Sequence, residues 1–245
     1  MEEKRYIYKK NYSLINCLIA FVLALSFNSV SAQEQIVPKL KYKKELKEKG
    51  CGSDLNKEGV GLQDKGLDLF FVKGKTAEAV KLLEQAVELE PRLFPSYSQL
   101  TFYYSEVQNN PLKAITLLIK GIKHCPKEPL LYYGLADCYA RIKQHQDAIN
   151  NYNKAKELGM EPAPPFFYNL GNSYAEIKEY DKAIENYKAA LKLDPKKFDA
   201  WRNLVIAYYQ KGDKKNAIKY AQELEKVDAK GDFGAWAREA IKQMK

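Results

Sequence analysis

Residues 164–195 read PPFFYNLGNSYAEIKEYDKAIENYKAALKLDP, and this stretch decides the fold. In its first half, four apolar or small residues share one face of an α-helix: Phe167, Leu170, Gly171 and Tyr174. Its second half repeats that spacing and then ends at a proline, with Ala183, Ile184, Tyr187, Ala190 and Pro195. The stretch therefore predicts two helices that pack against each other across a tight turn at 178–180. Gly171 lets the two helices approach closely.

This spacing is aromatic-x2-Leu-Gly-x2-Tyr, then Ala-x3-Tyr, then Pro, and it resembles the tetratricopeptide repeat, a helix-turn-helix unit of about 34 residues. A single unit of this kind cannot bury its apolar face alone, so the resemblance implies several stacked units. The fold class that it predicts is all-α, an α-solenoid of helix-turn-helix repeats.

The pattern recurs on both sides of residues 164–195 and predicts five repeats, at 60–93, 94–128, 129–163, 164–197 and 198–231. Gly66 and Leu67 depart from the pattern in the first repeat, and the second carries one extra residue in its turn, near Asn109. Residues 232–245 contain a last amphipathic helix, from Asp232 to Met244, which is predicted to cover the open face of the final repeat.

The sequence before the repeats predicts export. Basic residues precede an apolar run at 14–27, and small residues at 30–32 follow it where a signal peptidase would cut. The run is shorter than the roughly 20 residues that span a bilayer, which favours a cleaved signal peptide at 1–32 over a retained membrane helix. We therefore expect a periplasmic or secreted protein with no stable membrane span, and a charged N-terminal leader at 33–59.

Three cysteines remain after such a cleavage. Cys125 lies at a helix end and Cys138 lies inside the next helix, too far apart for a disulfide if both helices form. A bridge from Cys51 to either of them stays open. For Cys138, a small packing side chain is the favoured interpretation, since Ser173 takes the same place in the next repeat.

The sequence offers no catalytic constellation. His124 and His145 lie in successive repeats, at opposite ends of the helix between them, and no nucleophile elbow, zinc-binding helix or phosphate loop is present. We expect no catalytic, cofactor-binding or metal-binding residues and therefore no enzyme. A net charge of +9 over 245 residues is mildly basic, which argues against nucleic acid as the partner.

In tetratricopeptide arrays the first helices line a concave groove where proteins or peptides dock. Carried over by position, the resemblance predicts a partner-binding groove that contains Phe102, Tyr133, Asp137, Arg141, Tyr168, Asn172, Glu176, Arg202, Ile206 and Tyr209. These aromatic and charged residue types are typical of binding hot spots. We expect the double substitution Tyr168→Ala/Asn172→Ala to leave the fold intact and to weaken partner binding.

The main hypothesis is a non-catalytic scaffold or adaptor of a bacterial cell envelope that holds a protein segment in this groove. The alternative is a regulatory or docking subunit of an envelope enzyme or assembly machine. The identity of the partner and the oligomeric state are left open by the sequence, because groove residues define a surface and not its complement.

Overall fold

A computed structural model describes Cys51, residues 54–71 and residues 73–244. The predicted signal peptide, 1–32, and most of the predicted leader lie outside the described residues. The described part is helical throughout, with α3 (Lys57–Phe71), α4 (Thr76–Leu89), α5 (Phe94–Phe102), the π-helical turn η1 (Tyr103–Val107), α6 (Pro111–His124), α7 (Pro129–Arg141), α8 (His145–Glu157), α9 (Pro164–Glu176), α10 (Tyr180–Leu193), α11 (Phe198–Gln210), α12 (Lys214–Val227) and α13 (Asp232–Met244).

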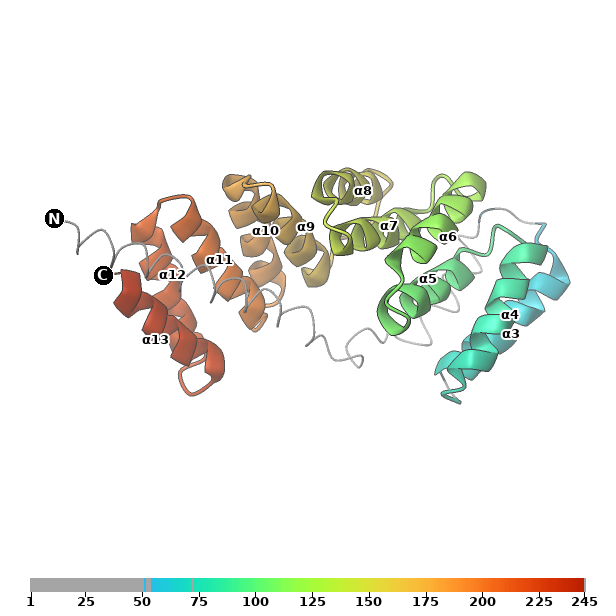
Figure 1. Ribbon diagram of the computed structural model, residues 1–245, viewed down its shortest axis with the longest axis horizontal. Coiled ribbons are helices and arrows are strands. Elements are labelled where there is room, and N and C mark those ends of the chain that lie inside the picture. The colour runs from blue at the N-terminus through green and yellow to red at the C-terminus, as the bar shows by residue number, and fades with distance from the viewer. Residues whose placement is uncertain (1–50, 52–53, 72, 245) are drawn as a thin grey trace, which may run out of the picture. The chain divides into compact units, whose positions relative to one another are not determined.

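The helices form a row of hairpins in which each helix packs on the next one along the chain (Figure 1). The most extensive contacts join the two helices of the first, third and fourth repeats, α3 with α4, α7 with α8 and α9 with α10, and each pair then packs on its neighbour. Among the described residues there is no strand. The fold is an all-α solenoid, as predicted.

Close approach at a glycine sets the packing within the first and the fourth helix pairs. A Cβ atom at Gly171 on α9 would lie 2.8 Å from Cε1 of Tyr187 on α10. Around this contact Leu170, Ala183 and Tyr187 are buried, as the apolar spacing predicts. A Cβ atom at Gly66 on α3 would meet Leu83 on α4 at 2.9 Å, so Gly66 occupies the same place in the first repeat.

The register of the first repeat differs from the prediction. The sequence pattern treats Gly66 and Leu67 as departures, yet Gly66 is the small contact residue, and the extra residue lies in the loop before α4, where Gly74 has a φ of +65°. In addition, α3 begins at Lys57, inside the range assigned to the leader. Asn56 caps this helix by accepting hydrogen bonds from the backbone N–H groups of Glu58 and Gly59, both at 3.0 Å.

The extra residue of the second repeat is also accommodated differently. The sequence predicts it in the turn near Asn109, but the helix itself widens at η1, where the backbone N–H of Gln108 donates to the carbonyl of Tyr103 at 2.9 Å. Such an i→i+5 hydrogen bond fits one more residue into a helical turn. The loop to α6 is therefore short, and Asn110 caps α6 by accepting from the backbone N–H of Lys113 at 3.1 Å.

The last helix, α13, has the predicted bounds and packs on α12 and α11. Its buried side chains include Ala237, Ile241 and Met244. Asp228 orders the preceding turn, since its carboxylate accepts hydrogen bonds from the backbone N–H groups of Phe233 and Gly234, at 3.0 and 3.2 Å. The helix that covers the final repeat, α13, is thus stabilised at its N-terminus by the carboxylate of Asp228.

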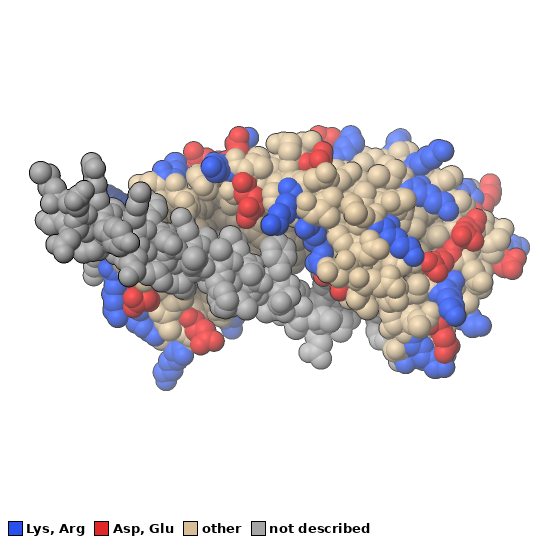
Figure 2. All heavy atoms as spheres, in the orientation of Figure 1, with Lys and Arg blue, Asp and Glu red and all other residues tan. Residues whose placement is uncertain are grey.

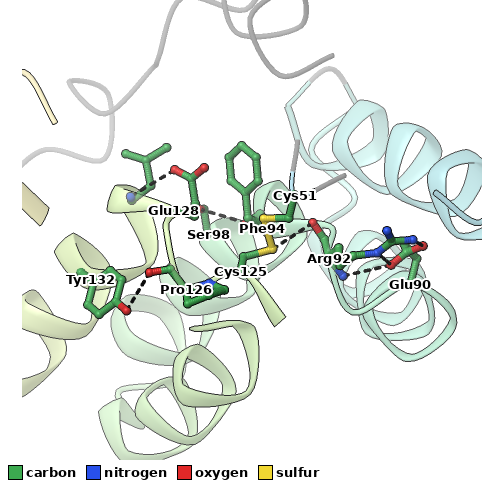
Figure 3. Close-up of a disulfide and its surroundings, with 10 residues drawn as sticks. Cys51, Glu90, Arg92, Phe94, Ser98, Cys125, Pro126, Glu128 and Tyr132 are labelled. Atoms are coloured by element: carbon green, nitrogen blue, oxygen red, sulfur yellow. Dashed lines mark hydrogen bonds and ion pairs between the residues drawn. A yellow bond between two sulfur atoms is a disulfide. The ribbon is translucent and has the colours of Figure 1, made fainter. Parts of the chain in front are cut away.

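A disulfide joins Cys51 to Cys125, with Cα atoms 5.6 Å apart, and so settles which partner Cys51 takes (Figure 3). Cys138 is free and buried, in agreement with a packing role. Beside the disulfide, Arg92 donates from Nε and Nη2 to the two carboxylate oxygens of Glu90, each at 2.7 Å (Figure 3). The same Nη2 also donates to the backbone carbonyl of Asp54 at 2.7 Å.

Glu90 is buried, and the Arg92 guanidinium lowers its pKa to about 2. Its carboxylate also accepts from the backbone N–H of Asn56 at 2.9 Å. The chain just before α3 is therefore held by a disulfide to the second repeat and by an ionic cluster at the end of the first. No helix in the described part of the chain is long and apolar enough to cross a membrane.

Candidate partner-binding surface

The first helices of the repeats form one continuous row. Each of α3, α5, α7 and α9 contacts the first helix of the next repeat, and α11 contacts α13. Successive second helices do not make contacts of that extent in the described residues. The first helices therefore lie closer together than the second helices and line the inner side of the stack. We call the row formed by α5, α7, α9 and α11 the first-helix surface.

The structure places nine of the ten predicted site residues on three adjacent helices of this surface. They lie on α7 (Tyr133, Asp137, Arg141), on α9 (Tyr168, Asn172, Glu176) and on α11 (Arg202, Ile206, Tyr209). Glu176 is exposed and the other eight are partly buried. Phe102 ends α5 and packs edge-on against Phe70 of α3, with ring centroids 6.1 Å apart.

Asn172 is the centre of a hydrogen-bond network that joins two repeats. Its side-chain oxygen accepts from the hydroxyl of Tyr187 on α10 at 2.8 Å and from the amide of Asn203 on α11 at 2.9 Å. The Asn203 amide also donates to the hydroxyl of Tyr168 at 3.3 Å. The network ties both helices of the fourth repeat to the first helix of the fifth.

Asp137 holds the equivalent place one repeat earlier. Its Oδ1 accepts a short hydrogen bond from the hydroxyl of Tyr152 on α8 and another from the amide of Asn169 on α9, at 3.1 Å. Burial, and to a smaller extent the nearby Glu106 carboxylate, raise the pKa of Asp137 to about 6, against the lowering effect of the hydrogen bonds. This carboxylate is thus costly to ionise.

The two arginines of the predicted site are already paired. Arg141 donates to Glu106 at 2.9 Å and to the side-chain oxygen of Asn109 at 3.5 Å, which joins α7 to the end of the second repeat. Arg202 donates to Asp199 at 2.8 Å, and its guanidinium lies 5.2 Å from the ring centroid of Phe233 on α13. These pairings mainly stabilise the packing of the helices. The groups left to bind a partner are therefore mostly aromatic rings, amides and carboxylates.

Four residues of these networks were not predicted as site residues from the sequence: Tyr152, Asn169, Tyr187 and Asn203. A signal for them exists, because the tyrosine pair and the asparagine pair each recur one repeat apart. The networks also revise one expectation. Asn172→Ala would leave the buried hydroxyl of Tyr187 without its acceptor, so Tyr168→Ala/Asn172→Ala is expected to lower stability as well as binding.

Asp137→Asn is expected to stabilise the chain above pH 6 and not below pH 4. The folded-state pKa of about 6 lies above the ordinary value of 3.8, so ionisation opposes folding once the pH exceeds both values and has no effect once the pH is below both. After allowance for solvent at this partly exposed group, we expect a gain of about 1 to 2 kcal/mol in the free energy of unfolding at pH 8.

Urea denaturation of the wild type and of Asp137→Asn at pH 4 and pH 8 measures this difference. Asn172→Asp provides the reciprocal control and should lose stability at pH 8. An equal gain for Asp137→Asn at both pH values would contradict the assigned pKa.

In the described residues no cluster of three or more His, Cys, Asp or Glu side chains has the geometry to hold a metal ion. Basic and acidic side chains are interspersed over the described part of the face in Figure 2. The first-helix surface therefore offers hydrogen bonds, aromatic area and isolated charges, which are the means of protein recognition.

Two family profiles match this chain. One, described as TPR repeat, matches residues 171–212, and the other, described as Tetratricopeptide repeat, matches residues 130–158 and 198–230. The chain contains tetratricopeptide repeats. The matched segments fall within the third, fourth and fifth repeats, which carry the hydrogen-bond networks described above.

Solved structures of other proteins share this fold. A crystal structure of MamA protein is 26% identical, with 71% of this chain and 96% of that chain covered and a TM-score of 0.61. The structure of MamA 41-end from Desulfovibrio magneticus RS-1 is 18% identical in sequence. The match covers 73% of this chain and 99% of the MamA chain, with a TM-score of 0.62.

A third similar structure is that of YrrB, described as a TPR protein with an unusual peptide-binding site. It is 20% identical, covers 81% of this chain and 97% of its own, and has a TM-score of 0.64. No curated protein matches the chain.

Proposed function

We propose that this protein is an exported, non-catalytic scaffold of a bacterial cell envelope, and that its first-helix surface holds a segment of a partner protein. The fold is that of a protein-interaction scaffold, and in it the predicted site residues of α7, α9 and α11 lie on adjacent helices. This juxtaposition is the observation that carries the proposal, because a peptide laid across three helices contacts all of these residues at once.

The disulfide supports the exported location. Cys51 and Cys125 are far apart in sequence and form a bridge that closes a long loop. Structural disulfides persist in oxidising compartments such as the periplasm and are rare in the bacterial cytosol. The proposed export rests on this bridge together with the N-terminal sequence pattern.

Site-specific photocrosslinking in the native envelope tests the proposal. A photoreactive amino acid at Ile206 of α11 is expected to capture a partner, since this side chain is partly exposed on the first-helix surface. The same amino acid at Glu185, an exposed position on the second helix α10, is the matched control. Capture from Glu185 but not from Ile206 would place the interface elsewhere.

Ile206→Glu is expected to reduce partner capture about fivefold or more, because a carboxylate would have to be desolvated where the aliphatic side chain now makes contact. Pull-down with the full exported chain measures the yield, and circular dichroism confirms that the variant is folded. Glu185→Lys changes the charge on α10 and should leave the yield unchanged. Equal yields from wild type and Ile206→Glu would exclude α11 from the interface.

A further inference from the structure

The third and fourth repeats build the same hydrogen-bond frame around different side chains. In the third, Tyr152 and Asn169 both donate to Oδ1 of Asp137. In the fourth, the equivalent donors, Tyr187 and Asn203, both donate to Oδ1 of Asn172. The frame needs one acceptor oxygen, and a neutral amide supplies it in the fourth repeat. The negative charge of Asp137 is therefore not required by the frame.

That charge has no counter-ion within the described residues. Arg141, one turn further along α7, is bound to Glu106 at 2.9 Å instead. The groups that donate hydrogen bonds to Asp137 are all neutral: Tyr133, Tyr152 and Asn169. A carboxylate accepts up to about four hydrogen bonds, so these three donors leave acceptor capacity on Asp137. A partly buried carboxylate with such capacity and no cation beside it attracts a cation from outside.

The neighbouring side chains also suit a cation. Tyr133 lies one turn before Asp137 on the same face of α7 and is partly exposed. Its ring stacks on Phe166 of α9, with centroids 5.9 Å apart and an interplanar angle of 20°. The face of a fixed tyrosine ring beside a carboxylate binds an ammonium or guanidinium group through both charge and cation–π attraction.

We propose that the surface of α7 beside α9 selects a partner segment that carries a Lys or Arg side chain, with Asp137 as the acceptor of that cation and Tyr133 as its aromatic neighbour. The inference rests on the proposed function, since it names the chemistry of the segment held by the first-helix surface. The fourth repeat, with Asn172 in place of Asp137, presents a neutral position to the same segment.

A selection from a random library of 12-residue peptides displayed on phage tests this inference even while the partner is unidentified. The wild-type chain is expected to enrich peptides with a basic residue at one fixed position. Replacing that residue by Gln in the enriched peptides should weaken binding roughly 10- to 100-fold, as expected for loss of a charge-assisted hydrogen bond at a partly desolvated site.

Asp137→Asn keeps the acceptor oxygen and should lose the same factor for the basic peptides, while it binds the Gln peptides as the wild type does. Glu185→Gln removes one negative charge from α10 and is the control for general electrostatic attraction. A similar loss of affinity in Glu185→Gln would overturn the inference, as would equal binding of basic peptides by wild type and Asp137→Asn.

The outcomes separate this inference from the proposed function. In one outcome, the selected peptides lack a common Lys or Arg and still lose binding in Ile206→Glu. That result would contradict the role of Asp137 and leave the first-helix surface as the binding site. Failure of the wild type to enrich any peptide, while Ile206 also captures no partner, would count against both.

Discussion

Gly171→Leu is expected to lower the free energy of unfolding by about 3 kcal/mol, the upper part of the range for overpacked cores. A Cβ atom at this position would lie 2.8 Å from Cε1 of Tyr187 and 3.3 Å from the backbone oxygen of Ala183. Tyr187 cannot rotate away freely, because it is buried and its hydroxyl is held by Asn172. The longer leucine side chain would therefore separate α9 from α10. Chemical denaturation followed by circular dichroism measures the change.

Gly61→Leu is the matched control for Gly171→Leu. Gly61 lies inside α3, is exposed, and nothing lies within 4 Å of the place a Cβ atom would take. Replacing an exposed helical glycine removes its entropic penalty, so this variant should gain about 0.5 to 1 kcal/mol. Equal destabilisation by the two leucines would mean that loss of glycine itself, and not the contact with Tyr187, is responsible.

Cys51→Ser is expected to lower the free energy of unfolding of the first two repeats by about 4 kcal/mol. The disulfide spans a sequence separation of 74 residues. Cross-linking a loop of that length removes about 4 kcal/mol of conformational entropy from the unfolded chain in the chain-entropy model. Since solenoid repeats are stabilised mainly by their neighbours, the loss should appear first in α3 to α6. Hydrogen exchange resolved by segment measures it.

Reductant and Cys138→Ser serve as the controls for Cys51→Ser. A reductant should lower the stability of the wild type to that of Cys51→Ser and leave the variant itself unchanged. Cys138→Ser removes the free thiol and keeps the disulfide, so its response to reductant should match the wild type. Equal free energies of unfolding for the wild type and Cys51→Ser, together with no effect of the reductant on the wild type, would show that the bridge contributes no stability.

The sequence predicted most of the helical architecture because the signature residues are local. Spacing within 129–231 identifies helix pairs from residues that are close together in the chain, and the helix Asp232–Met244 follows from its own amphipathic pattern. The start of α3 at Lys57 was missed, although the capping residue Asn56 is a local signal for it. The contacts of Asn56 and Asp54 with Glu90 and Arg92, which hold this start in place, are distant in the sequence and could not be predicted from spacing.

The site was predicted as a set of positions and not as a network. Repeat spacing placed Asp137 and Asn172 at equivalent points of the first helices, and the structure places them there. Spacing could not show that each is held by a tyrosine of the second helix and an asparagine of the next repeat, because those contacts depend on how the repeats stack. The pairing of Cys51 was undetermined for the same reason.

The π-helical turn at Tyr103–Val107 shows how a solenoid tolerates a change in chain length. An added residue in a repeat would rotate every later repeat if the helix simply continued by one more position, because each residue advances an α-helix by about 100°. Here the extra residue is confined to one widened turn, and α6 and α7 pack on their neighbours as the later repeats do. Single-residue insertions in arrays of this type can thus be neutral for the repeats that follow, which lets individual repeats vary in length while the alignment of their binding residues is preserved.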